Sequence, residues 1–195
     1  MINKSERVEV VRNIWALQSN LMDEYIRLGR LTDYPVDLNS RPGQEAVRKV
    51  MHFLTEELVE MGNVLYHPDF FEEAADFLHF LFELYIQVFH SPEELLYYLE
   101  EAEDKAQSYL SRDKKEQEWM YGIIHAIHMG SNTLKNKPWR VTESPTDVEK
   151  LKTSIASAWV VFIGFIYSMG IPMDVVYKEY EIKNQKNFKR IKDNY

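Results

Sequence analysis

Residues 55–80 read TEELVEMGNVLYHPDFFEEAADFLHF and contain two pairs of carboxylates separated by a short break. Glu57 and Glu60 are three residues apart, as are Glu73 and Asp76. On a helix this spacing puts both members of a pair on one face. A glycine and a proline between the pairs predict a short connection, so the two helices should pack antiparallel. We therefore expect four carboxylates to meet in one small volume.

Four like charges in a partly desolvated volume repel one another strongly. A divalent cation would remove that repulsion, and ligation by oxygen alone suits a hard ion, Mg²⁺ or Mn²⁺. Alanine and large apolar residues surround Asp76 in the sequence. Its helix is therefore expected to be buried, where an unpaired carboxylate is costly. The alternative interpretation is that both pairs lie on the solvated faces of ordinary acidic helices.

Length and composition predict a single helical domain. The chain has 195 residues, 45% of them hydrophobic and 13% aromatic, which is enough for a substantial core. Only seven glycines and seven prolines occur, which suits long helices better than a fold with many turns. Helical periodicity and helix-start residues predict helices at about 5–30, 44–61, 70–89, 91–110, 115–129, 147–169 and 173–189. We expect an all-α bundle of about six helices.

Charge and residue usage exclude several classes of function. The formal net charge is −8, which disfavours binding to nucleic acid. The absence of cysteine excludes a disulfide framework and a zinc–thiolate site. Residues 1–13 lack an apolar signal region, and the apolar run at 155–169 is interrupted by Ser and Gly, so a buried core helix is expected instead of a membrane span. The expected compartment is the cytoplasm, with no membrane partner.

Three motifs in the chain resemble those of one enzyme superfamily. The first is Glu56-Glu57-Leu-Val-Glu60, followed after twelve residues by Glu73-Ala-Ala-Asp76-Phe-Leu-His79-Phe80. The second is the end of the chain, YEIKNQKNFKRIKDNY at 180–195, and the third is Leu17-Gln18-Ser-Asn-Leu21. Together they resemble the all-α nucleoside triphosphate pyrophosphatases, which include MazG-like proteins, dimeric dUTPases and phage dCTPase–dUTPases. Ile191, Asn194 and Met22 depart from the pattern of the family.

The resemblance implies a single pyrophosphatase domain over residues 1–195, with a helical insertion at about 91–150. That insertion would cover the site, complete the bundle or form a dimer interface. The implied reaction is the Mg²⁺-dependent hydrolysis of a deoxynucleoside triphosphate to the monophosphate and pyrophosphate. The favoured substrate is dUTP, with dCTP next, and Mn²⁺ is an alternative metal. The resemblance also implies a homodimer.

The resemblance also assigns roles to individual residues. The metal ligands would be Glu57, Glu60, Glu73 and Asp76, and the catalytic residues Glu56 and Glu57. The phosphates would contact Lys183, Asn187, Arg190 and Tyr195, and the base would contact Gln18 and His79. Lys183, Asn187 and Arg190 support this independently, because spacings of four and three put an ammonium, an amide and a guanidinium on one helical face.

Three other functions are compatible with parts of the sequence. A MazG-type enzyme acting on purine nucleotides would share the acidic motifs. A di-iron carboxylate bundle would need Glu-x-x-His on two helices, and the chain contains no such motif. A non-enzymatic helical interaction protein would use the acidic pairs only as surface charge.

Overall fold

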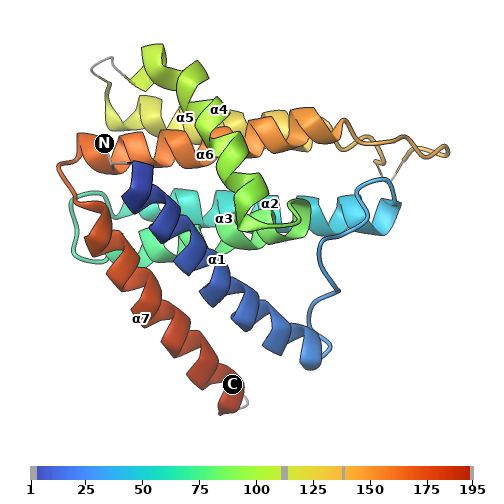
Figure 1. Cartoon of the computed structure of the whole chain (residues 1–195), viewed down its shortest axis with the longest axis horizontal. Helices are drawn as coiled ribbons and strands as arrows, with labels where there is room; N and C mark the ends of the chain where they lie inside the picture. Colours follow the sequence, from blue (N-terminus) through green and yellow to red (C-terminus); the bar gives the residue numbers. More distant parts are fainter. Residues whose placement is uncertain (1–3, 111–113, 138, 194–195) are drawn as a thin grey trace.

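The computed structural model describes residues 4–110, 114–137 and 139–193, and within these ranges the chain forms seven α-helices and no strand (Figure 1). The helices are α1 (Lys4–Arg27), α2 (Arg41–Asn63), α3 (Phe70–Val88), α4 (Pro92–Leu110), α5 (Glu116–Ser131), α6 (Val148–Ser168) and α7 (Met173–Lys192). The predicted all-α class is confirmed. The described ranges hold seven helices, close to the expected total of about six, and α4 and α5 lie where helices were predicted at 91–110 and 115–129.

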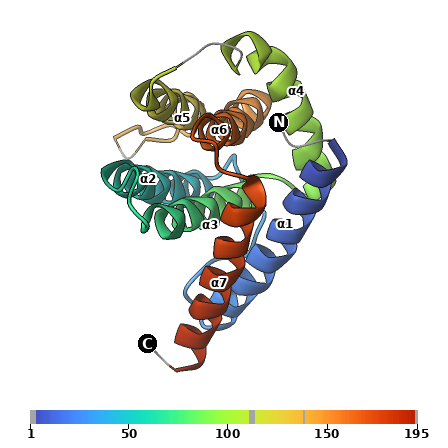
Figure 2. The ribbon, with the colours of Figure 1, turned by 90° about the vertical axis from the view of Figure 1, so that its left-hand side faces the viewer.

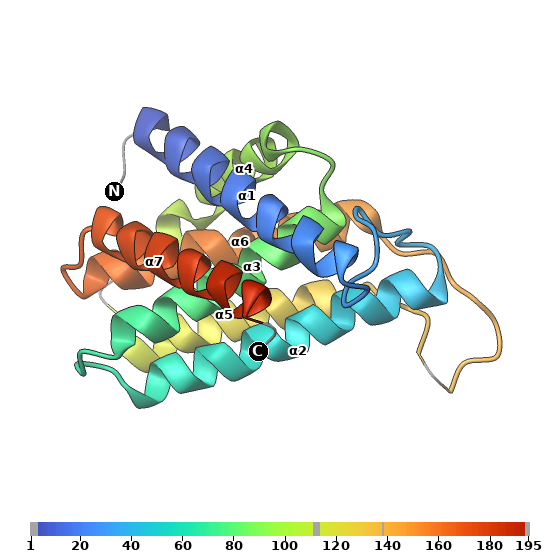
Figure 3. The same cartoon turned by 90° about the horizontal axis from the view of Figure 1, so that it is seen from below.

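The helices form three tiers when the molecule is viewed along the axes of α2 and α3 (Figure 2). α5 and α6 pack together in one tier, with α4 against α6, and α2 and α3 form the next. α1 and α7 run side by side across the other side of α3 (Figure 3). α3 therefore lies at the centre of the fold and contacts α1, α2, α6 and α7.

The central position of α3 follows from its sequence. Thirteen of its nineteen residues are buried, so it is apolar around most of its circumference. Phe77 stacks on Phe162 of α6 at a centroid distance of 4.9 Å, and Phe82 meets the edge of Trp159 at 5.6 Å. These contacts hold α3 against α6. The polar residues that remain on α3 are consequently available for function.

α6 is long and apolar enough to cross a membrane by length and composition alone. However, 61% of its apolar 18-residue window is buried inside the protein. Its apolar residues pack against α4 and α5 in the upper tier. Burial of this extent is the expected behaviour of a core helix. The prediction of a core helix at 155–169 agrees with this packing.

Helix ends differ from the predictions at three places. α1 ends at Arg27 and not near residue 30, because Gly29 adopts a positive φ of 68° and Arg30 N–H bonds back to the carbonyl of Tyr25. α2 begins at Arg41, before the predicted start at about 44, because the Ser40 side chain accepts a hydrogen bond from Gly43 N–H. α7 continues to Lys192, three residues further than expected.

Candidate active site

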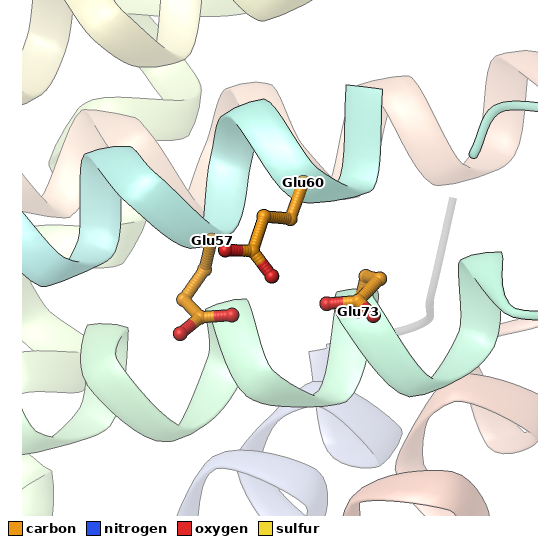
Figure 4. Close-up of side chains that lie close together, drawn as sticks. All are labelled: Glu57, Glu60 and Glu73. Carbon is orange, nitrogen blue, oxygen red and sulfur yellow. The ribbon is translucent and has the colours of Figure 1, made fainter. Parts of the chain in front are cut away.

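The connection at 64–69 turns the chain so that α2 and α3 pack against each other, as the break in residues 55–80 predicted. Glu57 and Glu60 on α2 face Glu73 on α3 (Figure 4). One carboxylate oxygen from each of the three lies within 4.8 Å of the others. Three of the four predicted ligands therefore meet in one place, and we call them the carboxylate cluster.

Asp76 lies outside this three-residue group and is paired with α7. Its Oδ2 is 2.6 Å from the ammonium of Lys183, which also lies 3.0 Å from Glu72 Oε1. The side chains of Asp76 and Lys183 are only 21% and 10% exposed. Lys183, predicted to contact phosphate, thus acts here as the counter-ion of two carboxylates.

The electrostatics show how poorly the carboxylates are compensated. Burial, together with the charges of Asp76, Glu60 and Glu73, raises the pKa of Glu57 to about 7. Burial and neighbouring carboxylates also raise the pKa of Glu73. Burial raises the pKa of Asp76 even though Lys183 acts in the opposite direction. One buried ammonium does not neutralise this group of acids, and a divalent cation would.

A cavity of about 430 Å³ opens beside the cluster, between α1, α2, α3 and α7. The residues that line it are Gln18, Leu21, Tyr25, Arg30, Leu31, Phe53, Glu57, Asp76, His79, Phe80, Glu83, Lys183, Asn187 and Arg190. None of the described residues from 91–150 is among them. The helices of this region, α4 and α5, pack on α6.

Gln18, His79 and Tyr180 form a buried polar network in the cavity wall. Gln18 Oε1 accepts a hydrogen bond of 2.8 Å from the hydroxyl of Tyr180 and lies 2.8 Å from His79 Nδ1. The His79 ring also stacks on Tyr180 at a centroid distance of 4.2 Å. Because a carbonyl oxygen only accepts, this contact assigns the proton to Nδ1.

The network leaves one acceptor and one donor group for a ligand. His79 Nε2 is buried and has no hydrogen-bond partner among the described residues. Burial and the charge of Lys183 lower the pKa of His79 to about 3, so the ring stays neutral and Nε2 remains an acceptor. Both contacts of Gln18 fall on its oxygen, and its amide NH₂ is therefore the donor of the pair.

The remaining predicted residues are placed as follows. Asn187 and Arg190 line the cavity, and Arg190 Nη1 donates a 3.3 Å hydrogen bond to Asn187 Oδ1. Glu56 is 53% exposed, lies 3.5 Å from His52 Nε2 and does not line the cavity. Tyr195 lies outside the described residues. The structure thus brings the predicted phosphate contacts of α7 to the cavity and leaves Glu56 away from it.

Several residues of the site were missed by sequence reasoning. Glu72 precedes Asp76 by four residues, and Tyr180 precedes Lys183 by three, so helical spacing could have found both. Glu83, seven residues after Asp76, shares the same face of α3. Burial raises the pKa of Glu83 to about 7, against the opposing charge of Lys49. Arg30 and Leu31 gave no signal, because the end of α1 at Arg27 is what turns them toward the cavity.

Comparison with known proteins adds one finding. The model of a family described as dUTPase matches residues 67–195, well over half of the chain. The matched part includes α3, with Glu73 and Asp76, and α7, with Lys183, and it also includes the region at 91–150. No curated protein and no solved structure matches the chain.

Proposed function

The chain belongs to the dUTPase family and is by that membership a nucleotide pyrophosphatase, and on this premise we propose that it hydrolyses dUTP, and dCTP less efficiently, to the monophosphate and pyrophosphate with Mg²⁺. The observation that carries the proposal is the convergence of Glu57, Glu60 and Glu73 beside a cavity lined with phosphate-binding groups. Carboxylates and basic residues in one cavity suit a metal-bound polyphosphate.

The carboxylate cluster fits a hard divalent cation. Its donors are oxygens only, they lie within 4.8 Å of one another, and their mutual repulsion raises the pKa of Glu57. Asp76, one turn beyond Glu73, would join them as the fourth ligand. Bound Mg²⁺, or Mn²⁺ in its place, would neutralise the charge on the phosphate oxygens. In its absence Lys183 partly balances these acids.

The residues of α7 would bind the polyphosphate. Asn187 and Arg190 already point their polar groups at each other and at the cavity, where an amide and a guanidinium bind phosphate oxygens well. Lys183 lies between these residues and the carboxylates, so a polyphosphate would share its ammonium with Asp76 and Glu72. Tyr195 is retained as a further phosphate contact by the resemblance of the terminal motif.

A carboxylate in or near the cluster would remove the proton from the attacking water. Glu57 is the best placed, because it lines the cavity and its carboxylate belongs to the cluster. Glu56 stays a candidate from its motif, although a rotation of its exposed side chain would be needed to reach the cavity. Comparison of Glu56→Gln with Glu57→Gln separates the two. A loss of kcat in Glu57→Gln that excess Mg²⁺ does not reverse, together with full activity in Glu56→Gln, would identify Glu57 as the base.

Gln18 and His79 would read the pyrimidine. The amide NH₂ of Gln18 donates to a ring carbonyl or ring nitrogen, and His79 Nε2 accepts from an adjacent N–H. Uracil offers this pair as O4 or O2 with N3–H, and cytosine offers it as N3 with its amino group. Phe80, which lies 5.4 Å from Phe53 between ring centroids, supplies an apolar wall for the ring. This pairing fits both uracil and cytosine, and the choice of a pyrimidine over a purine rests on the family.

The test is pyrophosphate release from dUTP, dCTP, dTTP, dATP and dGTP with Mg²⁺, using the wild type, Glu60→Gln and Asp76→Asn. We expect dUTP to be hydrolysed fastest and both variants to be inactive. Glu45→Gln, an exposed carboxylate on the same helix as Glu60, is the matched control and should retain activity. Undiminished activity in both site variants would contradict the proposal.

We also propose that the protein is a cytoplasmic homodimer that binds neither nucleic acid nor membranes; the family resemblance supports the dimer, and the net charge of −8 disfavours nucleic acid. Light scattering of the purified protein would test its oligomeric state. A monomer at micromolar concentration would contradict this part of the proposal and leave the proposed reaction untouched.

A further inference from the structure

A second cluster of like charges lies at the other end of α2, where this helix meets the connection between α5 and α6. It consists of the five basic residues Arg41, Arg48, Lys135, Lys137 and Arg140, which we call the cation cluster. Arg48 and Glu60 are twelve residues apart on α2, so roughly 18 Å of helix separates the cation cluster from the carboxylates. Nothing in the proposed reaction uses these residues.

The connection that carries three of these cations is held firmly at its base. Gln44 and Asn136, both fully buried, link it to α2: Asn136 N–H donates to Gln44 Oε1 at 2.8 Å, and Gln44 Nε2 donates to the carbonyl of Ser144 at 3.2 Å. Asn136 Nδ2 also donates to the carbonyl of Asn39 at 3.3 Å. This hydrogen-bond network therefore holds the segment that carries the cations in a defined position against α2.

The charge of the cluster is not compensated by carboxylates. Within the described residues none of its five members forms an ion pair. Arg41 and Arg48 donate instead to the backbone carbonyls of Arg140 and Leu134, both at 2.8 Å. Three further nitrogens, Nε of Arg41 and both Nε and Nη1 of Arg48, are buried without a hydrogen-bond partner. The one acid whose charge acts on Arg48 is the exposed Glu45.

The basic residues repel one another as the carboxylates do at the other end of the helix. Burial lowers the pKa of Lys137, and the charges of Arg48, Lys135 and Arg140 lower it further. An anion placed among these groups would remove the repulsion and satisfy donors that lack partners. The cluster thus has the features of an anion site.

An exposed aromatic residue lies directly beside the cations. Trp139, between Lys137 and Arg140 in the chain, is 78% exposed, and Val141 is 96% exposed. A large exposed aromatic ring next to guanidinium and ammonium groups suits a ligand with a flat ring and phosphates, because bases stack on aromatic faces. Two apolar side chains are too few for firm attachment to a membrane. The net charge of −8 opposes a long polyanion more than a short one.

We propose that the cation cluster is a second site that binds a free nucleotide, with its phosphates on the five basic residues and its base stacked on Trp139. The site is separate from the catalytic cavity and does not depend on the proposed hydrolysis. It would let the protein respond to a nucleotide that is not its substrate.

Binding of ATP and of inorganic tripolyphosphate can be measured by calorimetry on the full chain, with EDTA present so that no hydrolysis occurs. We expect the double variant Lys137→Met, Arg140→Met to bind ATP about tenfold more weakly. Lys178→Met, an exposed lysine on α7, removes one charge from another face and should leave the affinity within about twofold. Trp139→Ala should weaken ATP about fivefold without changing the affinity for tripolyphosphate.

Three outcomes would overturn the proposal. One is that neither probe binds the wild type, and another is that the double variant binds both probes as well as the wild type does. The third is that an oligothymidylate of eight residues, or vesicles of anionic phospholipid, bind through the cluster while ATP does not. Circular dichroism of each variant excludes unfolding as the cause of weaker binding.

Discussion

Two of the places where the molecule buries charge are built on opposite plans. Between α4 and α6, Lys152 is 5% exposed and pairs with Glu94, while Tyr98 donates a 2.5 Å hydrogen bond to Glu149. Between α2, α3 and α7, Glu72 and Asp76 share Lys183, and the carboxylate cluster beside them has no ammonium of its own.

The two regions differ in what they do to the pKa of their acids. Burial raises the pKa of Glu94, but the His90 N–H and Lys152 outweigh it, so the net shift is downward. In the second region burial and repulsion prevail, and the pKa of Glu57 rises to about 7. A balanced pair is tolerated without a ligand, whereas an unbalanced group is tolerated where a ligand completes it. The comparison therefore separates structural from functional charge.

The largest expected effect separates the two regions by activity. Glu73→Gln removes one ligand of the proposed metal and should reduce kcat/KM about 1000-fold, equivalent to about 4 kcal/mol of transition-state stabilisation. Glu149→Gln, the matched change in the balanced region, should leave kcat/KM within about twofold. Steady-state pyrophosphate release measures both. Equal losses in the two variants would remove the distinction between the regions.

The second-largest expected effect is a loss of stability without a loss of activity, and it belongs to the balanced region. Lys152→Met leaves Glu94 without its ammonium and should lower the free energy of unfolding by about 3 kcal/mol. The folded fraction should keep its kcat, because Lys152 does not line the cavity. Urea denaturation and an active-site titration check the two halves of this prediction. A change in kcat without a change in stability is the outcome that contradicts it.

The third effect tests whether the unbalanced region needs a cation. Lys183→Met removes the buried ammonium beside Asp76 and Glu72 and should cost about 2 kcal/mol of stability at pH 8 without metal. Mg²⁺ should restore part of this loss, because a bound ion stabilises the folded state by mass action. Thermal denaturation with EDTA and with Mg²⁺ gives the comparison. Identical metal-dependent shifts in Lys183→Met and in Lys178→Met, the surface control, would count against it.

The smallest effect is the dependence of stability on pH. Glu57 and Glu83 each have a folded pKa of about 7, above the value of 4.5 for a free side chain. The folded state therefore holds protons that the unfolded state has lost, and the stability that these two groups contribute is lost as pH rises from about 4.5 to about 7 and changes little above that. Burial lowers the pKa of His79 from 6.5 to about 3, so the unfolded ring takes up a proton that the folded ring does not, and the contribution of His79 to stability rises with pH between these two values.

Two substitutions separate the contribution of the carboxylate cluster to this pH effect from the contribution of Glu83. Glu57→Gln and Glu83→Gln should each remove part of the slope, measured as the midpoint of thermal unfolding. Mg²⁺ should abolish the contribution of Glu57 and leave that of Glu83. A slope that neither substitution changes would show that other groups carry the titration.

The carboxylate pairs could be predicted from sequence because all the information is local. Spacings of three residues put Glu57 with Glu60, and a glycine and a proline between the helices folded Glu73 back onto them. Local sequence also accounts for the start of α4, where the Ser91 hydroxyl accepts a hydrogen bond of 3.1 Å from Glu94 N–H. Periodicity and turn residues were sufficient for these features.

Contacts between distant residues could not be predicted in the same way. The pairing of Asp76 with Lys183 joins residues 107 positions apart, and helical spacing says nothing about which helix packs on which. Glu56 shows that a recognised motif does not fix the direction in which a side chain points. Its motif suggested a catalytic role, but the adjacent position on the helix turns it about 100° away from Glu57, toward solvent and His52. The residues that line the cavity depend on the crossing of α1 and α7 over α3, which only the structure provides.

That crossing has a consequence for how the protein is made. Gln18 and its hydroxyl donor Tyr180 are separated by 162 positions, and Asn184 reaches back 167 positions to the carbonyl of Leu17. The pair of helices α2 and α3, which carries the carboxylate cluster, can form early during translation. The contacts to the base and the phosphates can form only after α7 has left the ribosome. A nascent chain would therefore have its metal ligands in place for some seconds before it could bind a nucleotide.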